Sequence, residues 1–272
     1  MTFVLWARRV FSLQSALGRA LPLMLVAATA AAQAPPPEPP ANPAAPPKGI
    51  RVVELKGAIT QGAVAKFRDV LESAEPGRLP AGVIVLLDSQ GGDGLASIEI
   101  GRMVRAAKAH VFVRGRCASA CVYVLAGGVV RGVARDRAIG IHSPRLTTFV
   151  KGLGVVDINA ATSKTAAAAL AAGNKRSREY FAEMGAPDAL FAAMMATPSD
   201  QTRYLDLAEL PELGIVGIDP AYLAEYGPRA AMAYRIPKEE LARRILATPE
   251  KCMTDAGSAF VSCYRRVLRT GE

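Results

Sequence analysis

The feature that most constrains the fold is an apolar run, Val83 to Leu87, that is soon followed by two adjacent glycines, Gly91 and Gly92. A continuous apolar run of this length is typical of a strand that is buried on both faces of a parallel sheet. Adjacent glycines let the backbone turn sharply and come close to a ligand. The run therefore predicts a central parallel strand with a tight loop at its carboxyl end.

Strand and helix patterns alternate along the rest of the chain. We expect strands at 50–55, 110–114, 138–141 and 215–218, and helices at 61–73, 95–108, 122–126 and 187–196. An alanine-rich stretch, 157–184, predicts one long helix with Gly173-Asn174 as a candidate break. The alternation argues for an α/β fold with repeated strand–helix units and a helical C-terminal tail.

The N-terminal part has a targeting pattern. Residues 1–32 combine three arginines with an apolar segment that ends in small residues, which is typical of a secretory signal. The apolar segment is short for a transmembrane helix, although an uncleaved anchor is the alternative. Residues 33–48 are proline-rich and predict an extended linker. We therefore expect a signal peptide or anchor at 1–32, a linker at 33–48, one domain at 49–235 and a helical tail at 236–272.

This pattern predicts a periplasmic or secreted protein, or one that the N-terminal segment anchors to the inner membrane. The formal net charge is +9, but the basic residues are spread along the chain and no cluster is interleaved with aromatic residues. We therefore expect no binding to nucleic acid.

The four cysteines fit an exported protein. An even number of cysteines in an oxidising compartment suggests disulfides, and four cysteines allow three pairings. Sequence proximity favours the pairs Cys117–Cys121 and Cys252–Cys263. A metal site is the weaker interpretation, because the Cys-x₃-Cys spacing is loose and the chain has two histidines. We expect neither a metal nor another cofactor.

The first of these pairs brackets Ser119, in the sequence Cys-Ala-Ser-Ala-Cys, where a predicted strand turns into a helix. A hydroxyl at such a turn lies near free backbone N–H groups and the positive end of a helix dipole, which suits a serine nucleophile. The alternative is that small residues merely allow close packing. His142 also follows a strand end, whereas His110 opens a strand and is interpreted as structural. Because strand ends converge at one edge of such a sheet, Gly91-Gly92, Ser119 and His142 should meet there.

These residues resemble the Clp protease proteolytic subunit and its ClpP/crotonase superfamily, and most closely the exported ClpP-like bacterial proteins. The matching segments are DSQGGDGLASIEIGRMV, VRGRCASACVYVLAGG and AIGIHSP, within a resemblance that spans 50–218. It implies that Ser119 is the nucleophile, that His142 is the general base and that the N–H groups of Gly92 and Ala120 form the oxyanion hole. It also implies peptide substrates and a homo-oligomer.

The resemblance leaves the third member of the triad open. A gap-free alignment places Thr202 at the position of the acid, and Asp200 lies two residues earlier. We take Asp200 as the candidate, with Asp206 and Asp188 as weaker ones and a dyad without an acid as a further alternative. The family's Asn-Ser-Pro-Gly-Gly is Asp88-Ser89-Gln90-Gly91-Gly92 here, and the loss of the proline should loosen this loop.

The favoured function is an exported serine peptidase that works without an ATPase partner and cleaves unfolded polypeptides or short peptides. One alternative is a serine–lysine peptidase of the signal-peptide-peptidase type, in which Lys151 or Lys164 is the base. A crotonase-type acyl-CoA site is disfavoured by export. The remaining alternative is a catalytically silent ClpP-like scaffold for assembly or binding.

Overall fold

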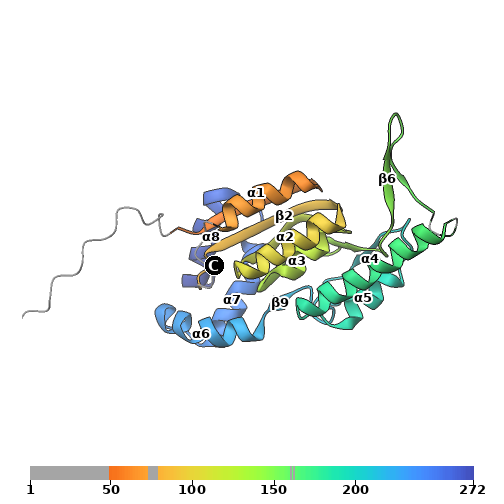
Figure 1. The fold of residues 1–272 in the computed structure, drawn as a ribbon. Coiled ribbons are helices and arrows are strands. Elements are labelled where there is room, and N and C mark those ends of the chain that lie inside the picture. Colours follow the sequence, from red (N-terminus) through yellow and green to blue (C-terminus); the bar gives the residue numbers. More distant parts are fainter. Residues whose placement is uncertain (1–48, 73–78, 160, 162) are drawn as a thin grey trace, which may run out of the picture. The chain divides into compact units, whose positions relative to one another are not determined.

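The protein is described by a computed structural model that covers residues 49–72, 79–159, 161 and 163–272 (Figure 1). The predicted signal segment and proline-rich linker lie outside these residues. The chain divides into two compact units, Met1–Pro46 and Pro47–Glu272, and the second contains all the described elements.

Seven strands of the described residues form one mixed, mostly parallel sheet. Its main path runs through β1 (Arg51–Ile59), β2 (Val83–Gly92), β3 (His110–Ala118), β4 (Val130–Val133) and β9 (Gly217–Ile218). The strands β1 to β4 are parallel, and β9 is antiparallel to β4. Beyond an irregularity in its register with β2, β3 pairs in parallel with β5 (Ile139–Ile141), which in turn pairs antiparallel with β8 (Arg203–Leu205). The first half of β3 thus contacts β4 and its last residues contact β5.

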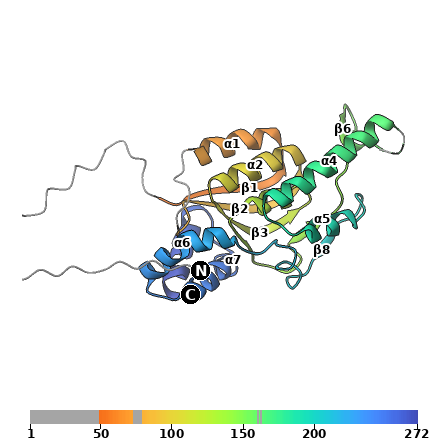
Figure 2. The ribbon, with the colours of Figure 1, turned by 60° about the horizontal axis from the view of Figure 1, so that its bottom comes forward.

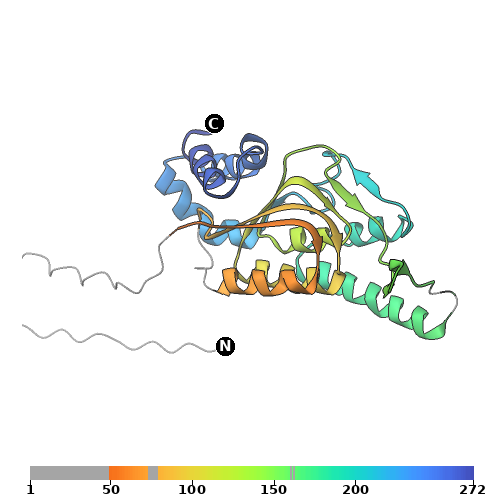
Figure 3. The same cartoon turned by 90° about the horizontal axis from the view of Figure 1, so that it is seen from above.

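Helices cover both faces of the sheet (Figures 2 and 3). On one face lie α1 (Gln61–Glu72), α2 (Gly94–Ala106) and α3 (Cys121–Gly127), with α4 (Lys164–Glu183) and α5 (Asp188–Met195) packed beyond them. On the other face lie α6 (Pro220–Tyr234), α7 (Lys238–Lys251) and α8 (Gly257–Thr270). The buried strand residues divide accordingly: Val85 and Val111 face the first layer, and Ile84 and Phe112 face the second. The mixed α/β architecture and the buried central strand agree with the sequence prediction.

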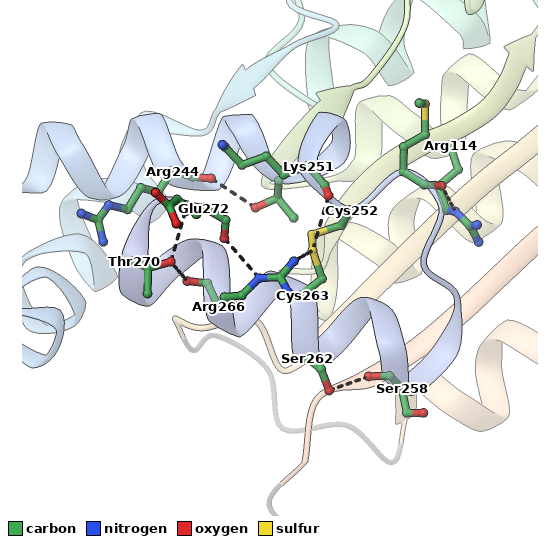
Figure 4. Close-up of a disulfide and its surroundings, with 12 residues drawn as sticks. Arg114, Arg244, Lys251, Cys252, Ser258, Ser262, Cys263, Arg266, Thr270 and Glu272 are labelled. Atoms are coloured by element: carbon green, nitrogen blue, oxygen red, sulfur yellow. Dashed lines mark hydrogen bonds between the residues drawn. A yellow bond between two sulfur atoms is a disulfide. The ribbon is translucent and has the colours of Figure 1, made fainter.

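The predicted C-terminal helical segment forms part of the second layer. Cys252 and Cys263 are joined by a disulfide that links the end of α7 to α8, and the guanidinium of Arg266 donates to the Cys263 sulfur at 3.5 Å (Figure 4). Both cysteines are buried within the apolar cluster between these helices and the sheet. The pairing is the one that sequence proximity favours.

The long helix differs from the sequence prediction in its start and in its continuity. The long helix begins at Lys164 rather than near residue 157, because Asp157 ends a hairpin made of β6 (Thr147–Val150) and β7 (Gly154–Asp157). The Ser163 hydroxyl accepts a hydrogen bond from the N–H of Ala166 and so caps the helix at that point. The helix also continues through Gly173-Asn174 without a break. Of the helices described, none combines the length and apolarity that crossing a bilayer requires.

Candidate active site

The carboxyl ends of three neighbouring strands meet at one edge of the sheet. In the β-ladder Ser89 of β2 is paired with Cys117 of β3, and Ala118 is paired with Gly140 of β5. One residue later, the N–H of Ser119 donates to the Gly140 carbonyl at 2.8 Å. The structure therefore brings together the segments that carry Gly91-Gly92, Ser119 and His142.

Ser119 occupies a strained turn between β3 and α3. Its φ angle is +54°, in the left-handed region, which costs a residue with a side chain about 1–2 kcal/mol. Strain of this kind concentrates at functional sites, where the surrounding structure holds it in place. Ala120 is the N-cap residue of α3, and the Ser119 carbonyl accepts from the N–H of Val122 at 3.1 Å. The turn therefore places the Ser119 side chain at the N-terminus of a helix, where backbone N–H groups have no carbonyl partner within the helix.

A disulfide closes this turn. Cys117 and Cys121 are bonded, with their Cα atoms 5.3 Å apart, and both are fully buried. The N–H of Cys117 donates to the Ala138 carbonyl at 2.8 Å, which ties the strand side of the loop to the segment before β5. The cross-link and the β-ladder thus hold both sides of the Ser119 turn.

Gly91 packs so closely against the Ser119 turn that a side chain would not fit at this position. A Cβ atom on Gly91 would lie 2.8 Å from the Cβ of Ser119 and 2.9 Å from the Ala120 nitrogen, both closer than real contacts allow. The φ angle of Gly91 is +98°, which also favours glycine. The sequence predicted a backbone that comes close to a ligand at this loop, and in the structure the backbone at Gly91 comes close to the Ser119 turn.

The Gly91-Gly92 loop is held firmly despite the missing proline. The buried Ser89 hydroxyl donates to the Gly57 carbonyl at 2.5 Å and accepts from the N–H of Gly91 at 3.0 Å. Asp93 caps α2, and its own N–H donates to the Ile59 carbonyl at 2.9 Å. Ser89 thus restrains this loop in the absence of the proline, and the expected loosening stays a prediction. Sequence analysis did not single out Ser89, although a serine two residues before the first glycine of a tight loop is a recognisable side-chain-to-backbone pattern.

His142 has one ring nitrogen engaged and the other available. Its Nδ1 lies 2.7 Å from the Ser143 carbonyl, and since a carbonyl only accepts, Nδ1 carries the proton. The Ser143 N–H donates to the Thr197 carbonyl at 2.9 Å, so Ser143 is itself fixed. In the neutral ring Nε2 is then the unprotonated nitrogen, the form that a general base requires. Within the described part of the chain, neither Nε2 nor the Ser119 hydroxyl has a hydrogen-bond partner, and the two are not bonded to each other.

The four candidates for the third position of the catalytic triad lie in different surroundings. Thr202 directly precedes Arg203, which pairs with Ile141, the residue before His142. Asp200 lies in the exposed turn before it, and its carboxylate makes no hydrogen bond or ion pair with the described residues. Asp206 is ion-paired with Arg137 at 3.5 Å, and Asp188 with Arg178 at 2.6 Å. In this structure the orienting partner of His142 is thus the Ser143 backbone carbonyl.

The two candidate lysines are exposed. Lys151 lies at the tip of the β6–β7 hairpin and Lys164 begins α4. A catalytic lysine base is usually buried, and neither position provides burial.

His110 lies at the opposite end of β3 and is structural, as the sequence indicated. Its ring is fully buried, with Nε2 2.9 Å from the Tyr222 hydroxyl and Nδ1 3.2 Å from the Tyr264 hydroxyl. Burial lowers the pKa of His110 from 6.5 to about 3, so the ring is neutral at physiological pH.

Metal-ligating side chains gather at one place in the described residues, where Cys252, Asp255 and Cys263 lie together. The disulfide between the two cysteines removes the thiolates that a metal would need. This group is therefore explained by the cross-link.

The chain is similar to solved structures over part of its length. The chain is similar to a point mutant of ClpP1 from Listeria monocytogenes, with a TM-score of 0.43 and 18% identity over 61% of this chain and 88% of that chain. It is also similar to a point mutant of the 1510-N membrane-bound stomatin-specific protease, with a TM-score of 0.42 and 16% identity over 62% of this chain and 78% of that one. No protein-family model matches the chain, and no curated protein does.

Proposed function

We propose that the chain is an exported serine peptidase that acts without an ATPase partner, with Ser119 as the nucleophile and His142 as the general base. The observation that carries the proposal is the strained Ser119 turn at the start of α3, at the same sheet edge as a histidine whose Nδ1 is hydrogen-bonded to a carbonyl. A nucleophile at a helix N-terminus beside an oriented base is the arrangement that acyl transfer requires.

The proposed reaction follows from these positions. Nε2 of His142 accepts the proton of the Ser119 hydroxyl as the oxygen attacks a peptide carbonyl. Negative charge then develops on the carbonyl oxygen, and the N–H groups of Ala120 and Gly92 stabilise it. His142 returns the proton to the leaving amine, and a water molecule hydrolyses the acyl-enzyme by the same sequence of steps. The Ser143 carbonyl stabilises the imidazolium, a role that a carboxylate fills in a full triad.

Export and assembly are parts of the same proposal. Two disulfides are typical of proteins that fold in an oxidising compartment, and they support the signal-peptide interpretation of residues 1–32. We propose a periplasmic or secreted homo-oligomer, in which the exposed β6–β7 hairpin and the exposed alanines of α4 are available for contacts between copies. Its substrates are unfolded segments or short peptides.

A catalytically silent scaffold is the second candidate. The observation in its favour is that Asp200 does not contact His142, so that no acid balances an imidazolium in the described residues. A fluorophosphonate probe separates the two candidates, because it labels an activated serine and nothing in an inert fold.

The mature protein should therefore be labelled alongside Ser119→Ala, His142→Ala and Ser258→Ala, the last replacing an exposed serine far from the site. We expect labelling of wild type and Ser258→Ala and its loss in the other two. Wild type that stays unlabelled would favour the scaffold. Labelling that survives His142→Ala but is lost in Lys151→Ala or Lys164→Ala would instead support a serine–lysine peptidase.

A further inference from the structure

A cleft of about 620 Å³ lies beside the candidate active site. Thr202 and Tyr204 of the β8 segment form part of its wall, and three arginines line it: Arg116, Arg137 and Arg203. Two acidic residues, Asp206 and Glu209, complete the lining. The cleft is therefore rich in charge, with more cations than anions.

Thr202, which lines the cleft, lies close to the strand ends that precede the proposed catalytic residues. His142 and Thr202 are each one residue beyond the last β5–β8 pair, Ile141–Arg203, and the Thr202 methyl carbon would be 2.7 Å from a Cβ atom on Gly140. The Cβ of Ala118 is 3.0 Å from the same point, and Ser119 is the next residue. Arg116 lies three positions before Ser119 in the chain, about 10 Å away along an extended backbone. A peptide held at Ser119 would thus have a neighbouring group within reach of the cleft.

Two of the three arginines in the cleft are ion-paired with a carboxylate. Arg137 is ion-paired with Asp206 at 3.5 Å, and Arg203 is ion-paired with Glu209. The guanidinium of Arg116 lies 5.9 Å from the centroid of the Tyr204 ring and has no carboxylate partner in the described part of the chain. An aromatic ring under a guanidinium restrains it while leaving its donors available. The cleft consequently offers one pre-positioned cation without a counterion.

We propose that this cleft is a subsite for a carboxylate of the substrate and that Arg116 is the specificity-determining residue. A guanidinium presents a planar pair of donors that matches a carboxylate. The carboxylate has two possible sources, an Asp or Glu side chain close to the scissile bond or the free C-terminus of a short peptide. The proposal rests on the peptidase function for its place in catalysis, but the binding that it predicts does not depend on turnover.

Binding is measured first, with Ser119→Ala so that no substrate is consumed. Three fluorescent peptides of otherwise identical sequence serve as probes: one with an internal Glu and an amidated end, one with Gln and an amidated end, and one with Gln and a free carboxyl end. We expect at least one carboxylate peptide to bind more tightly than the neutral peptide, and whichever does identifies the source of the carboxylate. Adding Arg116→Gln should weaken its binding about tenfold. Adding Arg176→Gln, which changes an exposed arginine on α4, should not.

Arg116→Glu and Arg116→Lys sharpen the test. The first should reverse the preference, so that a peptide with Lys in place of Glu binds best, and the second should retain part of the carboxylate preference. Equal binding of all three probes, or a preference that Arg116→Gln leaves intact, would overturn the subsite.

Measurements of turnover test the subsite and the peptidase function separately. In the Ser119-containing protein, the ratio of kcat/KM for carboxylate and neutral peptides should fall in Arg116→Gln, mainly through KM. If no peptide is hydrolysed but the binding preference holds, the subsite stands and the peptidase function fails. If hydrolysis occurs without any carboxylate preference, the peptidase stands and the subsite fails.

Discussion

A histidine lies near each end of β3, but the two histidines differ in their burial and hydrogen bonding. At its first residue, His110 is buried beneath the C-terminal helices, and both ring nitrogens bond to tyrosine hydroxyls. Just beyond its last residue, Ser119 is half-buried with a φ angle of +54°, and the nearby His142 has one nitrogen without a partner among the described residues. The Cys117–Cys121 disulfide closes the Ser119 turn, and the Cys252–Cys263 disulfide belongs to the apolar cluster under the C-terminal helices.

The difference shows how one strand serves stability and chemistry at once. Where every polar group is satisfied and desolvated, a histidine stays neutral and holds elements together. Where the backbone is strained and a polar group is left free, the same side chain is available to move a proton. The comparison predicts that changes at one end affect turnover and that changes at the other affect the free energy of unfolding.

The largest effect is expected at His142. His142→Ala should lower kcat/KM for a peptide by about 10²- to 10⁴-fold, because the proton of Ser119 loses its acceptor. The free energy of unfolding should change by less than about 0.5 kcal/mol, because the ring is half-buried and makes one hydrogen bond. Turnover of quenched peptides and urea denaturation of the same preparation measure both. A variant that turns over like wild type would exclude His142 as the base.

The converse effect is expected at His110. His110→Ala should lower the free energy of unfolding by about 3 kcal/mol, because it leaves a cavity and removes a partner from two buried tyrosine hydroxyls. The activity of the remaining folded protein should stay close to that of wild type, since this end of β3 is far from Ser119. Urea denaturation gives the stability, and active-site titration gives the activity per folded molecule. A large loss of specific activity with unchanged stability would contradict the division.

Much of this division could be predicted from the sequence. The apolar runs of β2, β3 and β5, the adjacent glycines and the two cysteine pairs carry direct signals, and the order of the strand ends follows from the topology that they imply. The apolar patterns end before the strands themselves end. β2 and β3 extend to Gly92 and Ala118, through residues too polar or small to form an apolar pattern, because ladder bonds to their neighbours hold them.

The remaining features lacked a sequence signal of their own. The carbonyl that orients His142 belongs to the backbone of Ser143. Because any residue at this position would supply a carbonyl, the sequence cannot indicate it, and the prediction named an acid, Asp200, instead. No strand was predicted at the β6–β7 hairpin, and the alanine-rich composition of 157–184 placed the start of the long helix before its cap at Ser163. α6 was not predicted either, and its Tyr222 supplies a partner of His110.

The two disulfides should differ in the same way as the two histidines. Replacing Cys252 and Cys263 by alanine should cost about 3 kcal/mol of stability, and replacing Cys117 and Cys121 about 2 kcal/mol, because the loops closed span 11 and 4 residues. Only the second change should lower kcat, by about tenfold or more, since it releases the Ser119 turn. Equal specific activity of the two double variants would mean that the β-ladder alone positions Ser119.

The smallest effect is the pH dependence that His110 contributes to stability. The unfolded chain binds a proton at His110 near pH 6.5, whereas burial lowers the pKa of the folded state to about 3. Between these values the unfolded state holds more protons, so this stabilisation is fully present above pH 6.5 and is lost as the pH falls, by up to about 1.4 kcal/mol per pH unit. Burial raises the pKa of the two tyrosine partners, so they do not titrate in this window. Urea denaturation at pH 5, 6, 7 and 8 should therefore show a steeper loss below pH 6.5 for wild type than for His110→Gln, whose amide can still bond to tyrosine but does not titrate. Parallel curves would show that the pKa of His110 does not change on folding and that this end of β3 is less dry than its burial indicates.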